Sequence, residues 1–138
     1  MKRKLMFVFL ILIVSALVSC DNPFSPATPE LEGWVTRDPY TNEVTGYNMR
    51  IVNIHDVSSS YGGPVFYTLY YVQGEYSEIP DIEPVERPVL ECPASGEFGY
   101  NNSTLYGKYT FWIVGSEDTD EMVNETDPSN LIVLDFGD

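Results

Sequence analysis

Short runs of aromatic and β-branched residues, separated by clusters of turn-forming residues, most constrain how this 138-residue chain can fold. The pattern begins near Leu31, and no stretch after that point keeps a helical period. β-Branched and aromatic side chains favour strands, whereas Gly, Pro, Asn, Asp and Ser favour turns. Residues 31–138 are therefore predicted to form one all-β domain.

Several stretches are predicted to be strands, and residues 65–72 carry the strongest signal. They are residues 31–36, 47–54, 65–72, 89–92, 98–100, 108–115 and 131–136. Residues 73–88 contain Pro80, Pro84 and Pro88 among acidic and amide side chains, a composition typical of an exposed crossover loop. About seven short strands in one domain favour a single antiparallel β-sandwich of the immunoglobulin-like kind.

Two of these stretches resemble strands of fibronectin type III domains. Residues 67–71, Tyr-Thr-Leu-Tyr-Tyr, are similar to that family's third strand. Leu105 followed by residues 109–115, Tyr-Thr-Phe-Trp-Ile-Val-Gly, is similar to its sixth. The resemblance covers about residues 31–136 and implies a fibronectin type III-like sandwich, in which the Tyr109 hydroxyl bonds the backbone near the preceding loop. The chain departs from the family because its second strand lacks the usual core tryptophan and because Leu105 lies closer to Tyr109 than usual.

The first 20 residues differ in character from this domain. Met1-Lys2-Arg3-Lys4 is basic, residues 5–18 are apolar, and a small residue follows, which together make up a secretory signal segment. The apolar stretch is shorter than the roughly 20 residues that a membrane-spanning helix needs. It ends in Leu17-Val18-Ser19-Cys20, which resembles the lipobox of bacterial lipoproteins.

The lipobox resemblance implies that residues 1–19 are a signal peptide and that Cys20 becomes the first mature residue. Its thiol would carry a diacylglyceryl group, and the freed amine could then take a further acyl chain such as palmitate. Two or more chains give stable anchoring where one does not. The expected location is the bacterial cell envelope, outside the cytoplasm, at either the inner or the outer membrane. An ordinary cleaved signal and a retained membrane anchor are the alternatives.

Residues 20–30 are predicted to be a tether between the lipid and the domain. Pro23, Pro26 and Pro29 recur at every third position, which is the period of polyproline II, a helix that rises ~3.1 Å per residue. Such a semi-stiff spacer holds the domain clear of the bilayer.

Charge excludes nucleic acid as a partner. Loss of the three cationic residues Lys2, Arg3 and Lys4 with the signal takes the formal net charge from -14 to -17, and such a body repels phosphates and anionic lipid headgroups. Membrane attachment is then expected through lipid alone. With Cys20 acylated, Cys92 has no partner for an intramolecular disulfide. We expect a buried thiol at the end of a strand, with a reactive or intermolecular thiol as the alternative.

No catalytic motif stands out in the sequence. The one histidine, His55, ends a predicted strand, Cys92 has no histidine near it, and neither Gly-x-Ser-x-Gly nor a Gly-rich phosphate loop occurs. No spacing singles out two carboxylates for glycoside hydrolysis. We therefore expect a protein that is not an enzyme, a surface or strand-end role for His55, and no cofactor apart from the lipid on Cys20.

The best metal candidate is an acidic stretch before the last strand. Carboxylate oxygens are ligands that Ca²⁺ prefers. The candidates are Glu117, Asp118, Asp120 and Glu121, followed by Glu125 and Asp127. The stretch lacks the glycine and the regular spacing of an EF-hand loop. A solvated hairpin loop is the simpler interpretation, so no metal is expected.

Strand alternation points to a candidate binding face. If Tyr67, Leu69 and Tyr71 point into the core, their neighbours in the strand point outward, and the same rule exposes Trp112 in the sixth strand. The candidate face comprises Phe66, Tyr70, Trp112, Leu131 and Val133. A contiguous exposed aromatic surface often marks a binding site. The alternatives are that the linker or a loop covers this face, or that the alternation is out of phase.

These features predict a lipid-anchored, extracytoplasmic module that binds or scaffolds an envelope protein and does not catalyse. A carbohydrate-binding module that stacks sugars on Trp112 and nearby tyrosines is the alternative. A Ca²⁺-binding adhesion-type domain is a further alternative.

Overall fold

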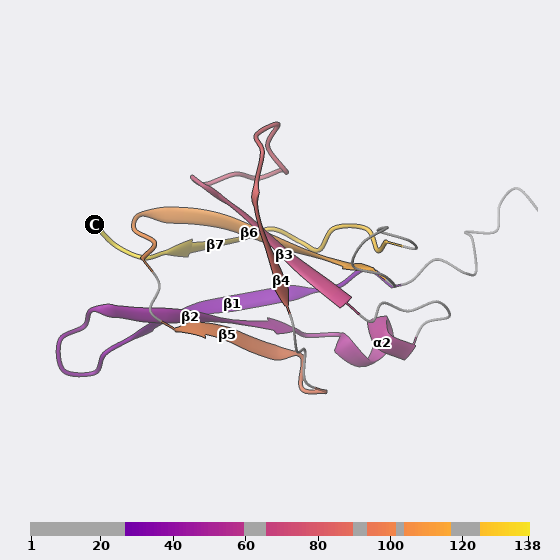
Figure 1. Ribbon diagram of the computed structural model, residues 1–138, viewed down its shortest axis with the longest axis horizontal. Coiled ribbons are helices and arrows are strands. Elements are labelled where there is room, and N and C mark those ends of the chain that lie inside the picture. Colours follow the sequence, from indigo (N-terminus) through magenta and orange to yellow (C-terminus); the bar gives the residue numbers. More distant parts are fainter. Residues whose placement is uncertain (1–26, 60–65, 90–93, 102–103, 117–124) are drawn as a thin grey trace, which may run out of the picture.

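The computed structural model describes residues 27–59, 66–89, 94–101, 104–116 and 125–138. These residues form seven strands and one short helix (Figure 1). In chain order the elements are β1 (Leu31–Arg37), β2 (Val44–Ile51), α2 (Ile54–Ser59), β3 (Phe66–Gln73), β4 (Val85–Val89), β5 (Glu97–Asn101), β6 (Lys108–Ser116) and β7 (Ile132–Asp135).

The strands form two antiparallel sheets that enclose one core. The smaller sheet has the order β1-β2-β5, and the larger has the order β4-β3-β6-β7. In Figure 1, β1, β2 and β5 form the lower layer, and β6 and β7 lie in the upper layer. The predicted all-β sandwich of about seven strands is thereby confirmed.

The core between the sheets is rich in aromatic rings. The ring centroid of Tyr47 in β2 lies 5.2 Å from that of Tyr100, 5.4 Å from that of Phe111 and 5.7 Å from that of Phe136. Aromatic pairs at such separations stabilise by about 0.5–1.5 kcal/mol beyond the burial of their area. Other buried core residues are Leu31, Met49, Ile51, Ile54, Val57, Tyr67, Leu69, Tyr71, Val89, Ile113 and Leu134.

β4 corrects the prediction that residues 73–88 form a loop throughout. Val85 pairs opposite Tyr71 of β3, and Val89 pairs opposite Tyr67. Pro88 is compatible with this pairing because β4 lies at the edge of its sheet, where the missing proline N–H can face away from the ladder. The expected strand 89–92 therefore begins earlier than predicted, and its residues 90–92 lie outside the described part of the chain.

α2 is a second correction, because the pattern predicted no helix and extended a strand to residue 54. β2 ends at Ile51, and α2 begins at Ile54. Ile54 and Val57 are three residues apart and are both buried, so they share one side of the helix, while His55 is exposed. Six residues are too few for a helical period to show in the sequence.

The segment before β7 completes the hydrogen bonding of β6. The Thr126 N–H donates to the Gly115 carbonyl at 2.9 Å, and the Gly115 N–H donates to the Thr126 hydroxyl at 3.0 Å. The Ser129 N–H donates to the Ile113 carbonyl at 3.0 Å, and the Ile113 N–H donates to the Ser129 hydroxyl at 3.0 Å. Residues 126–129 thus act as a partner for the part of β6 that β7 does not reach.

Candidate functional site

The register of β3 and β6 brings two residues of the candidate face together. Tyr67, Leu69 and Tyr71 are buried between the sheets, as the alternation predicts. Tyr70 pairs directly opposite Trp112. Because alternate residues of a strand point to opposite faces, these two rings share the outer face of the four-stranded sheet.

Tyr70 and Trp112 are nevertheless buried, with 8% and 4% of their surface exposed. Their rings stack at a centroid distance of 5.8 Å and an interplanar angle of 11°. They belong to an apolar group, called here the outer cluster, that also includes Val72, Tyr76, Val114 and Leu131. The expectation that Tyr70 and Trp112 are exposed was therefore wrong, whereas Phe66 and Val133 are exposed.

The β3–β4 loop comprises residues 74–84. Its first residues cover the outer cluster. Thr110 of β6 is fully buried. Its hydroxyl donates to the Gly74 carbonyl at 2.8 Å and accepts from the Tyr76 N–H at 3.0 Å. Gly74 has a φ of +119°, a conformation that side-chain-bearing residues rarely adopt. The chain therefore folds back and packs the Tyr76 ring on the outer cluster, which is the alternative in which a loop covers the predicted face.

Two further contacts join this part of the loop to β6. The Gly74 N–H donates to the Lys108 carbonyl at 2.8 Å. The Lys108 ammonium lies 2.6 Å from a carboxylate oxygen of Glu75, and this hydrogen bond raises the pKa of Lys108 above its ordinary value. The base of the β3–β4 loop, residues 74–76, is thus held by backbone, hydroxyl and charged groups of one strand.

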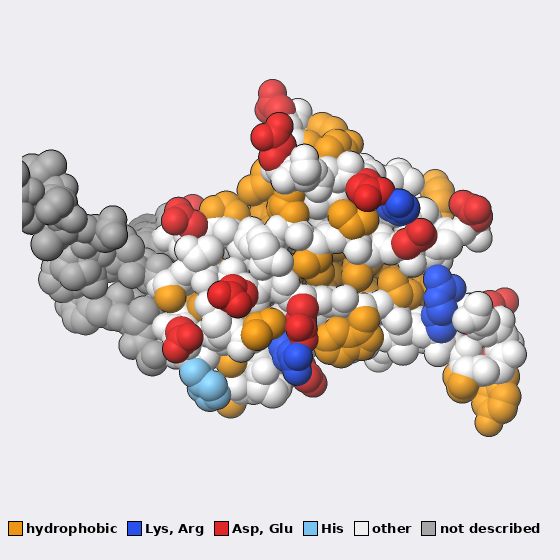
Figure 2. All heavy atoms as spheres, turned by 180° about the vertical axis from the view of Figure 1, so that it is seen from behind, with side chains coloured by type: hydrophobic (Ala, Val, Ile, Leu, Met, Phe, Trp, Pro, Cys, Tyr) orange, Lys and Arg blue, Asp and Glu red, His pale blue; other side chains and the backbone are white. Residues whose placement is uncertain are grey.

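Beyond this base the β3–β4 loop projects from the sandwich (Figure 1). Ile79 and Ile82 are 44% and 53% exposed, and Val85 at the start of β4 is also exposed. The acidic residues among them are Glu78, Asp81 and Glu83. Figure 2 shows acidic and hydrophobic side chains next to one another on the projection at the top of the molecule. The loop therefore presents apolar side chains within an acidic rim.

The exposed tryptophan of the chain is Trp34, which lies on the three-stranded sheet and is 43% exposed. Trp34 pairs opposite Asn48 of β2. Arg50 forms an ion pair with Glu32. Glu32 and Trp34 are alternate residues of β1, and Asn48 and Arg50 are alternate residues of β2, so the four side chains share one face of the sheet. An indole ring with amide, guanidinium and carboxylate groups near it is a second surface with binding chemistry.

Several predicted positions lie outside the described residues. They are Cys20, Cys92, Glu117, Asp118, Asp120 and Glu121. Residues 102–103, in the loop before β6, lie outside them too, so the predicted hydrogen bond of the Tyr109 hydroxyl stays a prediction. Within the described ranges, no group of three or more His, Cys, Asp or Glu side chains could hold a metal ion. In the same part of the chain, no helix has the length and apolar character needed to span a bilayer.

The chain matches no protein-family model and no curated protein. Its function is therefore inferred from the fold and from the surfaces described above.

Proposed function

We propose that this chain is a lipid-anchored, non-catalytic β-sandwich module of the bacterial cell envelope that binds another envelope protein. Cys20 carries the lipid, the residues that follow it hold the domain away from the membrane, and the β3–β4 loop makes the contact. This tether ends earlier than the predicted residue 30, because Pro29 is fully buried and the Glu30 N–H donates to the Asn53 side chain. The observation that carries this proposal is the exposure of Ile79 and Ile82 on a loop whose base is tied to β6.

The loop has the properties of a protein-contact element. Interfaces commonly have an apolar centre and a polar rim, and here two isoleucines lie among acidic side chains. Full burial of an isoleucine side chain contributes about 1.5–3 kcal/mol. Because the base of the loop is already anchored, less conformational entropy is lost when a partner binds. The acidic rim favours a partner with an apolar groove bordered by basic residues.

The edge of β4 extends the same contact surface. Among the described residues β4 pairs with β3 alone, so its other side offers backbone groups to a partner. Pro88 has no N–H to donate. A partner strand would therefore pair near Val85 and Glu86, next to the exposed isoleucines.

Site-specific photo-crosslinking tests this contact. A photoreactive amino acid is placed at Ile82 in the full-length chain in its own cells, and, as a matched control, at Val52, which is similarly exposed at 51% but follows β2. We expect a discrete protein adduct from position 82 and none of the same mass from position 52. The double variant Ile79→Ser, Ile82→Ser, with the photoreactive group moved to Val85, should lose the adduct. Equal adducts from positions 82 and 52 would contradict the proposal.

The anchor is tested separately. Metabolic labelling with a fatty acid should mark the wild-type chain and fail on Cys20→Ala. Equal labelling of the two would refute lipidation at Cys20 and leave the protein contact to be judged by crosslinking alone.

The fibronectin type III-like subclass is also proposed. Its support is that residues 67–71 and 109–115, which carry the resemblance, occupy the neighbouring strands β3 and β6. A solved structure that places the Tyr109 hydroxyl in open solvent would argue against this subclass.

Trp34 favours a second candidate function, carbohydrate binding. Trp112 is buried and cannot stack on a sugar, but the Trp34 indole is exposed beside polar groups that can bond hydroxyls. On a glycan array, binding that Trp34→Ala abolishes and that the Ile79→Ser, Ile82→Ser variant retains would favour this function over the protein contact.

A further inference from the structure

A cavity of about 380 Å³ opens between the edge strands β4 and β5. Its lining residues include Tyr71, Arg87, Tyr100, Asn101, Thr104 and Leu105. Pockets that hold small ligands usually have volumes of about 300–1,000 Å³ and combine apolar walls with a few placed polar groups. This cavity is of that kind and size.

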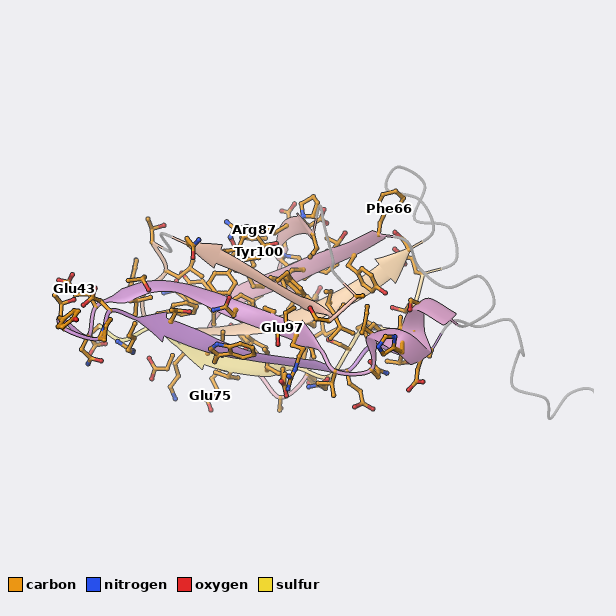
Figure 3. All side chains as sticks on the ribbon, turned by 90° about the horizontal axis from the view of Figure 1, so that it is seen from below. Glu43, Phe66, Glu75, Arg87, Glu97 and Tyr100 are labelled. Atoms are coloured by element: carbon orange, nitrogen blue, oxygen red, sulfur yellow. The ribbon has the colours of Figure 1, made fainter. Side chains whose placement is uncertain are left out.

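Arg87 of β4 is held in one orientation beside the cavity. Its Nη1 donates a hydrogen bond of 2.9 Å to the Tyr47 hydroxyl. Its Cζ lies 4.4 Å from the ring centroid of Tyr100 and 5.7 Å from that of Tyr71. In Figure 3 the labelled Arg87 and Tyr100 lie next to one another. A guanidinium carries five N–H donors, and the Tyr47 hydroxyl accepts from one of its nitrogens.

The surroundings of Arg87 are unusual for this acidic chain, which has 21 Asp and Glu residues. Among the described residues, Arg50 and Lys108 form ion pairs with carboxylates, whereas the contacts of Arg87 are with tyrosine side chains. No carboxylate lines this cavity in the described part of the chain. Burial raises the pKa of Tyr47 to about 12, although the charge of Arg87 acts to lower it, so the tyrosine stays neutral at physiological pH. The cavity thus has a positive wall that lacks a built-in counter-charge.

From this geometry we propose that the β4–β5 cavity binds a small hydroxylated carboxylate of the sugar-acid type. The planar fork of Arg87 matches a carboxylate, which can accept two parallel N–H bonds. Asn101 and Thr104 supply amide and hydroxyl groups for ligand hydroxyls, and Leu105 and Tyr71 supply apolar contact. The ligand class follows from the charge and polarity of the lining residues, and the proposal does not depend on the protein contact of the β3–β4 loop.

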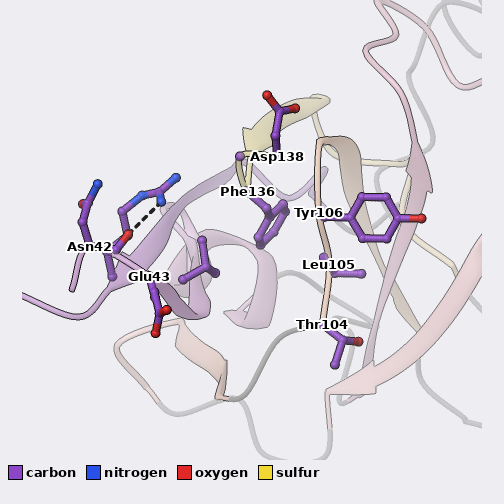
Figure 4. A pocket seen from close by; sticks show the side chains of 10 residues that line it. Asn42, Glu43, Thr104, Leu105, Tyr106, Phe136 and Asp138 are labelled. Atoms are coloured by element: carbon purple, nitrogen blue, oxygen red, sulfur yellow. Dashed lines mark hydrogen bonds between the residues drawn. The ribbon is translucent and has the colours of Figure 1, made fainter.

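A second cavity of the same domain serves as the comparison. It has a volume of about 590 Å³ and is also lined by an arginine, Arg37, whose Nη1 donates to the Asn42 carbonyl at 3.1 Å. Its lining residues include the acidic residues Glu43 and Asp138 (Figure 4). These two negative charges would repel a carboxylate, so the Arg37 cavity should not bind the same ligand.

The test is a titration of the folded chain at about 0.15 M salt, where the repulsion of the acidic surface is screened. Glucuronate is the probe, and glucose, inorganic phosphate and a dipeptide with a free carboxyl terminus are the comparison ligands. Binding is followed by calorimetry and by the NMR signals of the Arg87 side chain and the Tyr100 amide. We expect saturable glucuronate binding with a Kd in the millimolar range, typical of a small fragment. Glucose, phosphate and the dipeptide should each bind at least about tenfold more weakly, a difference of about 1.4 kcal/mol.

The variants separate a binding role of Arg87 from a structural one. Arg87→Lys keeps the charge but loses the fork, and it should weaken glucuronate binding by about tenfold. Arg87→Met should abolish binding, and Arg37→Met should leave it unchanged. The NMR shifts in the wild-type chain keep the test decisive even if an Arg87 variant fails to fold. Equal binding of glucose, tighter binding of phosphate or of the dipeptide, or no saturable shift at Arg87 would overturn the proposal.

Discussion

Replacing Thr110 with valine should loosen the base of the β3–β4 loop and leave the shape of the core nearly unchanged. Valine is close to threonine in size but has no hydroxyl. Thr110→Val therefore removes the bond to the Gly74 carbonyl and the bond from the Tyr76 N–H. The Thr110 side chain is fully buried, whereas its two backbone partners are only partly shielded from water.

The magnitude follows from these two bonds. A typical hydrogen bond contributes about 0.5–1.5 kcal/mol net, and a buried donor that is left without an acceptor costs about 1–3 kcal/mol. Loss of the bond to the Gly74 carbonyl and of the acceptor for the Tyr76 N–H together gives a range of about 1.5–4.5 kcal/mol. Because these two backbone groups are only partly shielded from water, we expect a loss near the lower end of that range, about 2 kcal/mol in the free energy of unfolding. With a urea m-value of about 1–3 kcal/mol/M, the unfolding midpoint should fall by about 1 M.

Equilibrium urea unfolding measures the loss, and acrylamide quenching reports on the cover over the outer cluster. In a Trp34→Phe background the remaining tryptophan is Trp112, whose fluorescence should become easier to quench in Thr110→Val. Thr45→Val is the control, because its hydroxyl donates to the Thr36 carbonyl on the exposed surface and its loss should change stability by less than about 0.5 kcal/mol. An unchanged midpoint together with unchanged quenching would refute the role given to the Thr110 hydroxyl.

Two other predictions concern Tyr47 and Asn130. Burial raises the pKa of Tyr47 to about 12, whereas an unfolded tyrosine ionises near pH 10. The folded state therefore holds its proton longer, and stability that is present below about pH 10 should be lost as the pH rises toward about 12. Tyr47→Phe should reduce this loss of stability, which is measured by comparing urea unfolding midpoints at about pH 9 and about pH 11. An equal loss in the variant and the wild type would contradict this role of Tyr47. The Asn130 side chain accepts from the Leu31 N–H at 2.8 Å and donates to the Leu31 carbonyl at 2.9 Å. Asn130→Ala should therefore lower the free energy of unfolding by about 2 kcal/mol in the same assay. Asn130→Asp keeps only the acceptor and should lower it by an intermediate amount. No difference between Asn130→Ala and the wild type would refute this role.

Local pattern was sufficient to predict most of the strands. Period-two alternation placed Tyr67, Leu69 and Tyr71 in the core, because the direction of a strand side chain depends only on its position along the strand. The same rule applied to β1 would have pointed Trp34 outward, since Leu31 is buried in the core and Val35 packs against it. That signal was present in the sequence, but the prediction of a binding face concentrated on the third and sixth strands.

Local pattern was not sufficient where an element is short or lies at an edge. Pro88 disfavours a strand in the sequence pattern. In the edge strand β4, however, its missing N–H can face away from β3, so no hydrogen bond of the ladder is lost. α2 is too short for a period, and its Ile54 and Val57 are helical because they pack on the core. Tertiary contacts decide such segments, since local preferences of this size are easily overridden.

The sequence by itself determined that the chain is an all-β sandwich and which way the rings of β3 and β6 point. Only the tertiary structure decided what covers them. Tyr70 and Trp112 are buried because the Thr110 hydroxyl bonds the backbone of Gly74 and Tyr76, which places the Tyr76 ring over this face of the sheet. In the same way Arg87 meets tyrosines from three other strands, which the sheet topology brings together. Direction is a local property of the backbone, whereas burial and site formation depend on which distant segments come to lie alongside.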